Sequence, residues 1–297
     1  MGELAGLLTS FFWSLSSVFF TKGGRQIGSI NVNRIRLVFA VLLVMLAHQV
    51  TQGSLIPLHA DAQRWLWLGL SGFAGLVLGD SFTFQAYVMV GNRLGTLMSA
   101  LSPVIGALIA WIFLGEKLAL IQVGGILLSI SGVILVVLKC RDGNGVTHDR
   151  RRFALGILCG LGGAIGQATG LVLAKKGLAG DFPAVSGLVM RMLVSLVLIW
   201  LVAVFMGQIR STLEAARNPI ALRAIAAGAV VGPFIGVWLS LLAVQLTYVG
   251  VASTLTSLAP IFVLPINKFV FKEEVTRWAV IGTLIALSGV AVLFLFN

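Results

Sequence analysis

The sequence is poor in charge and in the groups that most catalytic and metal sites use. Charged residues make up 10% of the 297 residues, against roughly 25% in an ordinary soluble domain. The two cysteines and three histidines lie apart without metal-ligand spacing, so neither a metal site nor a disulfide framework is predicted. No G-x-x-x-x-G-K-[ST] phosphate-binding motif occurs. The sequence therefore predicts no cofactor and no ATP-driven step.

Acidic residues are also scarce, because only 10 Asp and Glu accompany 21 Lys and Arg. A nucleic-acid surface would gather its basic residues on one folded face. Here they lie in short gaps between apolar runs, which is typical of loops beside anionic lipid headgroups. This distribution excludes nucleic acid as a partner and predicts a lipid bilayer instead.

Long apolar runs dominate what remains, since 58% of the residues are hydrophobic. A bilayer core about 30 Å thick needs about 20 mostly apolar residues per helix. We therefore expect an all-α polytopic membrane protein with ten transmembrane helices, the first of which is retained rather than cleaved as a signal peptide. The expected spans are 3–21, 34–51, 64–90, 94–114, 118–138, 153–174, 186–206, 222–247, 251–271 and 276–296.

The chain contains an internal repeat. Residues 69–139 align with residues 226–296 at a constant offset of 157, which pairs Pro103 with Pro260 and Glu116 with Glu273. Shared Pro, Glu and Gly at one offset indicate duplication. We expect two five-helix repeats, residues 1–139 and 153–297. An odd number of helices inverts the second repeat in the membrane, an architecture of secondary transporters.

Loop charge predicts the orientation. The loops after the odd-numbered spans, with their flanking ends, hold 16 of the 21 Lys and Arg. By the positive-inside rule these loops are cytoplasmic and both termini lie outside.

Two stretches carry a resemblance to a known family: LMSALSPVIGALIAWIFLGEKLALIQVGGILLSISGVILV at 97–136 and LTSLAPIFVLPINKFVFKEEVTRWAVIGTLIALSGVAVLF at 255–294. With the two five-helix repeats, they resemble the EamA-type family of the drug/metabolite transporter superfamily. The resemblance implies a ten-helix, multi-pass carrier that moves small organic molecules, often outward, across a bacterial cytoplasmic (inner) membrane. It also implies cytoplasmic termini, opposite to the loop charge. The first-helix Glu that serves as proton site in small multidrug resistance relatives is absent from TSFFWSLSSVFF.

Asp80 is the one acidic residue near the middle of a predicted span. A lone carboxylate at that depth costs at least about 2.5–3.5 kcal/mol on insertion scales, so it should face the bundle interior with a partner or a water-filled cavity. It is either a protonatable coupling site or ligand for a substrate ammonium, or a neutral carboxyl that joins two helices. Thr83 and Tyr87 share its helix face, and Gln85 lies to one side.

Other polar groups inside the spans are candidates for contact with a solute, or else ordinary helix-packing groups. They are Trp13, Ser14, Ser17, Ser99, Ser102, Gln167, Thr169, Trp238, Gln245, Thr254 and Ser257.

Three further sets of residues are candidates for movement or assembly. Pro103 and Pro260 each remove a helical hydrogen bond at equivalent repeat positions, as matched hinges or plain kinks. Arg36 with Glu273 at one face, and Arg191 with Glu116 at the other, form either alternating gates or interfacial anchors. Gly162 and Gly166 form a small-x-x-x-small pair for internal packing or a dimer surface, so a monomer or homodimer is expected. These sets complete the candidates.

The function that fits is secondary transport of small organic solutes, such as amino acids or related amphiphiles, by alternating access. An exporter is expected, with protons as a candidate coupling ion. An uncoupled facilitator or channel is the alternative. A membrane-embedded enzyme is disfavoured, because an aspartyl protease needs two membrane carboxylates and only Asp80 is so placed.

Overall fold

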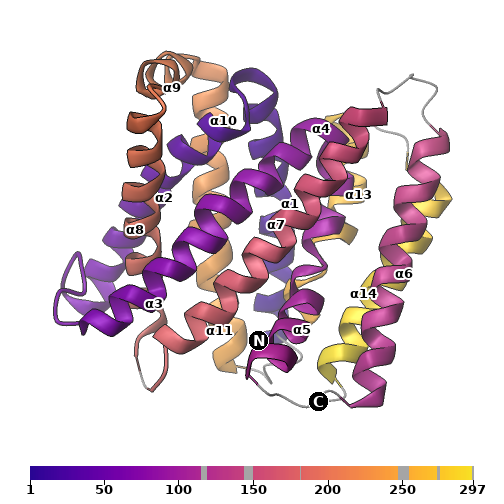
Figure 1. Ribbon diagram of the computed structural model, residues 1–297, viewed down its shortest axis with the longest axis horizontal. Coiled ribbons are helices and arrows are strands. Elements are labelled where there is room, and N and C mark those ends of the chain that lie inside the picture. The colour runs from indigo at the N-terminus through magenta and orange to yellow at the C-terminus, as the bar shows by residue number, and fades with distance from the viewer. Residues whose placement is uncertain (115–118, 144–149, 181, 247–253, 273–274, 296–297) are drawn as a thin grey trace.

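The computed structural model describes residues 1–114, 119–143, 150–180, 182–246, 254–272 and 275–295. Within these ranges the chain folds into helices and contains no β-strand (Figure 1). The elements, of which η1 and η2 are π-helical, are α1 (Gly2–Ile27), α2 (Ser29–Gln52), α3 (Ala62–Gly72), η1 (Phe73–Gly79), α4 (Asp80–Ser99), α5 (Ser102–Leu114), α6 (Leu120–Gly143), α7 (Arg150–Gly177), α8 (Ala184–Phe205), α9 (Ile209–Ala216), α10 (Pro219–Ala229), η2 (Val230–Gly236), α11 (Val237–Leu246), α13 (Ala259–Val270) and α14 (Arg277–Leu295).

Among the described residues, eight helical stretches are long and apolar enough to cross a membrane. The longest, Ala62–Ser99, is 38 residues and runs through α3, η1 and α4, whereas the apolar stretch Thr254–Val270 is shorter than a full span. The all-α polytopic fold is therefore confirmed, and the count of ten stays a prediction because the fourth and ninth expected spans are interrupted.

The end of the third expected span is marked by Gly91. This residue has φ 86° and ψ 159° inside α4. Glycine has no Cβ, so it takes this left-handed conformation without steric cost. The turn separates the long rod of residues 62–90 from the short helical stretch that ends at Ser99, at the boundary that hydropathy predicts.

Both halves are interrupted at equivalent places. The π-helical segments η1 (73–79) and η2 (230–236) begin and end at residues that differ by the offset of 157. The breaks at 100–101, before α5, and at 257–258, before α13, obey the same offset. Pro103 and Pro260 are the second residues of these two helices. The missing Pro N–H costs nothing in a first helical turn, so the prolines begin helices here rather than kink their interiors.

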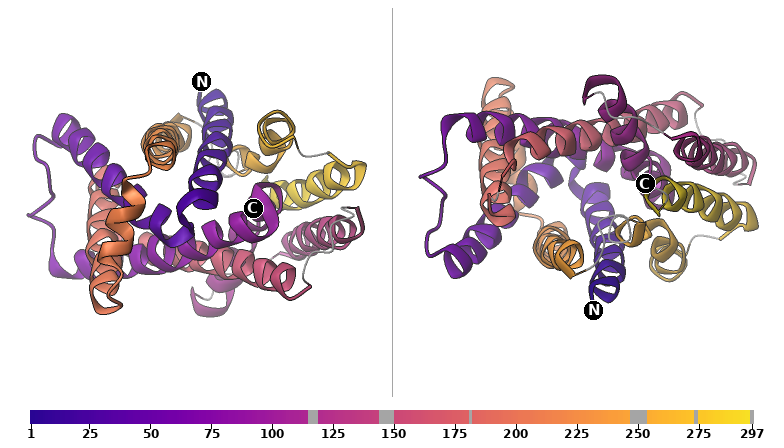
Figure 2. Two further views of the ribbon diagram at one scale, coloured as in Figure 1. Left: turned by 90° about the horizontal axis from the view of Figure 1, so that it is seen from above. Right: turned by 90° about the horizontal axis from the view of Figure 1, so that it is seen from below.

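The closing helices of the two halves, α6 and α14, pack together at one end of the molecule (Figures 1 and 2). A Cβ built at Gly125 would lie 2.8 Å from the Gly289 carbonyl, and one built at Gly282 would lie 2.7 Å from the Gly132 carbonyl. Gly125 and Gly282 are repeat equivalents, as are Gly132 and Gly289, so the contact is reciprocal. Reciprocal contacts are those of a two-fold axis between the helices, as inverted repeats require.

The halves interlock through their first helices. α1 packs on α10, η2, α11 and α13 of the second half, while α7 packs on α3, η1, α4 and α5 of the first. Figure 2 shows α1 among the helices of the second half. A site lined by one half is therefore completed by a helix of the other.

The two faces of the molecule differ. The start of α1 and the end of α14 lie at one face, here called the terminal face, and α9 lies at the opposite face (Figure 1). At the α9 face, α2 begins at Ser29 rather than at residue 34 as expected. Arg34 is buried there because it donates to Thr212 Oγ1 at 2.8 Å and to Gln208 Oε1 at 2.7 Å. Arg36 consequently lies in the third turn of α2 instead of at its end.

Candidate functional site

The site is built where α7 approaches η1. Gly79 ends η1, and a Cβ built on it would lie 3.0 Å from the backbone N of Gln167. A Cβ on Gly166 would lie 2.6 Å from the Cα of Gly79. Glycine on both helices therefore lets the backbones touch, which brings the Gln167 side chain to Asp80. Gly166 and Gly162, which faces Phe82, both pack inside this one chain.

Asp80, the first residue of α4, is buried and bonded through both carboxylate oxygens. Arg36 Nη2 lies 2.5 Å from Oδ2, and Gln167 Nε2 donates to Oδ1 at 2.5 Å. Gln167 also donates to the Gly75 carbonyl at 3.3 Å. The carboxylate is thus shared between a cation of its own half and an amide of the other half.

Arg36 is itself held from several sides. Its Nη2 donates to Asn33 Oδ1 at 2.9 Å, one turn earlier on α2. Asn33 Nδ2 in turn donates to the Leu76 carbonyl and to Ser81 Oγ, each at 2.9 Å. The Arg36 guanidinium lies over the Phe84 ring, 5.1 Å from its centroid, a cation–π contact. Such hydrogen-bonded pairing is what a buried ion pair requires to persist in an apolar interior.

A second arginine approaches the same carboxylate. Arg191 of α8, the repeat equivalent of Arg36, interacts electrostatically with Asp80. A Cβ built at Gly75 would lie 3.5 Å from Arg191 Nη2, so the guanidinium lies against η1. Its Nε is buried and has no hydrogen-bond partner within the described ranges. Arg36 and Arg191 enter from opposite faces, each as the eighth residue of its helix.

The expected polar stripe on α4 divides in two. Thr83 faces α7 beside Gly163, and its buried Oγ1 has no hydrogen-bond partner in the part of the chain that the structure describes. Tyr87 instead packs in an apolar cluster with Phe84 and other residues of α1, α2 and α10. Gln85 accepts a hydrogen bond from Ser29 and so joins α4 to the start of α2. Asp80 and Thr83 share the α7 interface, and Tyr87 does not.

The expected groups of α1 lie against the second half. A Cβ built at Gly236 would lie 3.2 Å from Trp13 Nε1, so Trp13 packs on η2. Ser14 Oγ lies 2.7 Å from the Ala259 carbonyl at the start of α13. Ser17 donates to the Ser14 carbonyl at 2.7 Å, within α1. These serines fit helix packing.

Ser102 lies at the break before α5. It is buried, and its Oγ has no hydrogen-bond partner among the described residues. Ser99, just before the break, donates to the Gly95 carbonyl at 3.1 Å. Ser257 occupies the equivalent break before α13. The breaks therefore place hydroxyl groups beside two non-helical turns in the interior, as in the discontinuous helices of secondary transporters.

Trp238 is another candidate that the structure describes, and it lies apart from Asp80. It is 42% exposed and contacts Phe234. The Gln245 side chain, Glu116 and Glu273 lie outside the described residues. The gate pairs consequently stay a prediction, and the structure places Arg36 with Asp80. Among the described residues no cluster of three or more His, Cys, Asp and Glu could hold a metal.

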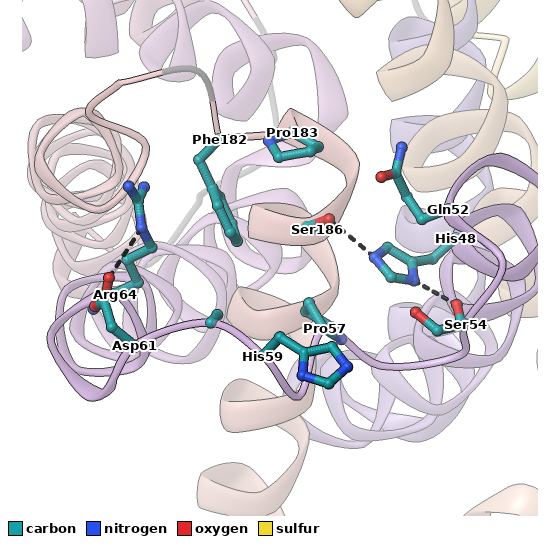
Figure 3. Close-up of a pocket in the computed structure, with 11 residues that line it drawn as sticks. His48, Gln52, Ser54, Pro57, His59, Asp61, Arg64, Phe182, Pro183 and Ser186 are labelled. Atoms are coloured by element: carbon teal, nitrogen blue, oxygen red, sulfur yellow. Dashed lines mark hydrogen bonds and ion pairs between the residues drawn. The ribbon is translucent and has the colours of Figure 1, made fainter.

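A separate pocket of about 410 Å³ opens at the terminal face, where α2, α3 and α8 meet (Figure 3). His48 Nε2 lies 2.9 Å from Ser186 Oγ, so this buried imidazole joins α2 to α8. Across the pocket Arg64 is paired with Asp61 at 3.2 Å. The pocket is lined by His48, Gln52, Ser54, Pro57, His59, Ala60, Asp61, Arg64, Phe182, Pro183 and Ser186.

Two residues of the hydrogen-bond network around Asp80 are not predicted from the sequence. No sequence pattern points to Asn33, and the sequence predicts a gate pair for Arg36 rather than contact with Asp80. Both lie in SINVNRIR, whose polarity resembles a loop although it forms the first turns of α2. A usable signal was the depth of Asp80, since a membrane carboxylate requires a cation and the repeat supplies equivalent arginines at 36 and 191. A further contact between the halves, Asn92 Nδ2 to Asn267 Oδ1 at 3.1 Å, had no such signal.

Comparison with known proteins supports this architecture. A model of the EamA-like transporter family matches residues 1–138 and 154–295. Human "Solute carrier family 35 member G1" is 25% identical over 180 residues, 59% of this chain and 48% of that protein. A chloroplastic WAT1-related protein of Arabidopsis thaliana is 28% identical over 150 residues, 49% of this chain and 33% of that protein. This chain thus aligns with a third to a half of each relative.

A solved structure shares the fold. One crystal structure aligns with 99% of this chain and 96% of its own, with a TM-score of 0.64 and 18% sequence identity. At that identity the alignment shows the fold alone.

Proposed function

The chain belongs to the EamA-like transporter family, and from that premise we propose that it is a secondary carrier that exports small organic solutes by alternating access. Membrane transport of small solutes follows from the family. Direction, solute class and coupling are what this proposal adds.

The observation that carries the proposal is the position of Asp80 between the halves. Its carboxylate binds Arg36 of the first half and Gln167 of the second. In inverted-repeat transporters the substrate site lies near the midplane at the repeat interface. A buried ionisable residue in a membrane span is a functional candidate by default. Asp80 meets both conditions.

Asp80 supports coupling in the following way. A proton on the carboxylate would remove its charge and weaken the bond to Arg36. Loss of the charge would also weaken the bond of Asp80 to Gln167, which joins α4 to α7 of the other half, and the two halves would then be able to rock. The gate pairs Arg36–Glu273 and Arg191–Glu116 belong to this proposal, since Arg36 would leave Asp80 to reach Glu273. Pro103 and Pro260 are the proposed hinges.

The two repeats proposed to rock are residues 1–139 and 153–297, and the proposed location is a bacterial cytoplasmic membrane. The reciprocal contacts of α6 and α14 support a fixed axis for this motion. The carrier would act as a monomer or homodimer.

The test compares metabolite release from cells that overproduce the wild type or Asp80→Asn at equal membrane abundance. We expect some solutes to leave faster with the wild type, and the variant to lose that release. Glu214→Gln is the matched control, because Glu214 is exposed on α9 and pairs with the exposed Arg210, away from Asp80 and from the terminal face. Equal release by wild type and Asp80→Asn would exclude a role for Asp80.

An uncoupled facilitator is the second candidate, favoured by the polar groups at the two helix breaks. Reconstituted vesicles separate it from a coupled carrier. A coupled carrier accumulates solute against its gradient when a proton gradient is imposed, and Asp80→Asn abolishes that accumulation. A facilitator only equilibrates the solute in both proteins.

A further inference from the structure

The buried cluster at η1 contains one more cation than anion. Arg36 and Arg191 both act on Asp80, which is the carboxylate of this cluster within the described part of the chain. Both Asp80 oxygens are already bonded, to Arg36 and to Gln167. An unpaired charge at membrane depth is costly and marks a substrate or ion pathway. The surplus positive charge is therefore where a negative group of a ligand would be stabilised.

Arg191 is the cation of this cluster whose side-chain donors bond no described residue. A guanidinium carries five N–H donors. The structure gives the Arg191 side chain no hydrogen bond to a described residue, and its Nε is buried without a partner. The Nε atoms of Arg34 and Arg36 are also buried without a described partner, but Arg34 bonds Thr212 and Gln208 through its two terminal nitrogens. Within this cluster Arg36 bonds Asp80 and Asn33 through Nη2, whereas the Arg191 side chain bonds no described residue.

The position of Arg191 on α8 relates it to the terminal-face pocket. Ser186 lines that pocket and lies five residues before Arg191 on the same helix. Five residues correspond to about 7.5 Å along a helix axis. Arg191 therefore lies one and a half turns deeper than the pocket, between the terminal face and Asp80.

We propose that the transported solute carries an anionic group, a carboxylate of a small organic acid, and that Arg191 binds it. The inference rests on the proposed function, since it names the solute class of that same site. A planar guanidinium matches a carboxylate with two parallel hydrogen bonds. The bound anion would balance the second arginine while Asp80 balances the first. An inorganic anion such as chloride shares this chemistry, and the experiment distinguishes the two.

The first test profiles all solutes whose release from overproducing cells depends on the wild-type protein. We expect these solutes to carry an acid group, with release lost in Arg191→Gln and partly kept in Arg191→Lys. Solutes that are neutral or only cationic would overturn the inference and leave the proposed function standing. No protein-dependent flux in cells or vesicles would overturn the proposed function and this inference with it.

The second test uses the acid so identified and its matched primary amide as competitors of uptake into vesicles. In the wild type the acid should compete about 10- to 100-fold better than the amide, as expected for one set of charge-assisted hydrogen bonds. Arg191→Gln should abolish that preference, whereas Arg34→Gln should keep it. A preserved preference in Arg191→Gln would overturn the assignment. Chloride flux that depends on Arg191, without organic-acid flux, would overturn the solute class.

Discussion

The segments η1 and η2 have the same backbone and different chemistry. Each is a seven-residue π-helix with Gly at equivalent positions, and each packs against the first helix of the other half. After η1 comes Asp80, which bonds Gln167 of α7. After η2 comes Val237, and its neighbour on α1 is Trp13, which packs on Gly236. The π-helix is thus part of the duplicated scaffold, whereas the charge belongs to one half only.

The difference indicates that the shared backbone and the single carboxylate have separate roles. The shared backbone features, two π-helices and two helix breaks, give both halves the same capacity to bend. A single carboxylate supplies the polar centre, because a second one in the same interior would add a further desolvation cost and repel the first. The features that both halves share would then allow the halves to move, and the carboxylate that only one half carries would take part in binding.

The largest expected effect comes from removing the charge that distinguishes η1. Asp80→Asn leaves Arg36 buried and unpaired, so we expect a loss of about 3–5 kcal/mol in the free energy of unfolding. Asp80→Asn combined with Arg36→Met should recover most of that stability, since both charges are then gone, and should remain inactive in transport. Unfolding of the purified proteins in detergent measures the first effect. A double variant no more stable than Asp80→Asn would contradict the pairing.

The next effect comes from placing the charge in the other half. Val237→Asp puts a carboxylate after η2, where the neighbour is Trp13 instead of Gln167. We expect destabilisation of about 2.5–3.5 kcal/mol, the cost of an Asp at mid-membrane on insertion scales. Neither stability nor transport should return when Val237→Asp is combined with Asp80→Asn. Recovery would mean that the halves are interchangeable in chemistry as well as in backbone.

A smaller effect tests the symmetric contact of α6 and α14. Gly132→Ala places a methyl group against the backbone of Gly282 and Ala286, so we expect destabilisation of about 1–3 kcal/mol from overpacking. Gly124→Ala is the control on the same helix, because a Cβ there meets no atom within 4 Å. It should be neutral or stabilising by about 0.5–1 kcal/mol. Thermal unfolding of the two variants side by side provides the measurement. Equal stabilities would argue against the close contact.

The smallest effect concerns the matched prolines. Pro103→Ala and Pro260→Ala occupy first helical turns, so each should change stability by less than about 1 kcal/mol. If the breaks are hinges, both variants should lower the transport rate to a similar extent with unchanged abundance. An effect of one proline alone would show that the breaks serve different purposes. Initial rates in vesicles give the comparison.

Much of the fold follows from the sequence because the bilayer imposes strong constraints. Apolar length defines the spans, and the offset of 157 predicts that features of one half recur in the other. The sequence also points to Asp80, because a carboxylate within an apolar run is unusual. Gln167 is likewise among the residues that the sequence predicts for the site. The sequence predicts the start of α2 less well. The polar side chains of SINVNRIR lie in a helix because groups of α4, η1 and the α9 region accept their hydrogen bonds.

What the sequence by itself determined is the membrane class, the repeat at an offset of 157, and the carboxylate that had to face the interior. Only the tertiary structure decided which cation meets it. Arg36, Asp80, Gln167 and Arg191 come from four helices, and their meeting depends on close approach of α7 to η1 at paired glycines. Hydropathy registers the free energy of each residue in lipid, one position at a time. Pairing instead depends on distances between helices, which no single span contains.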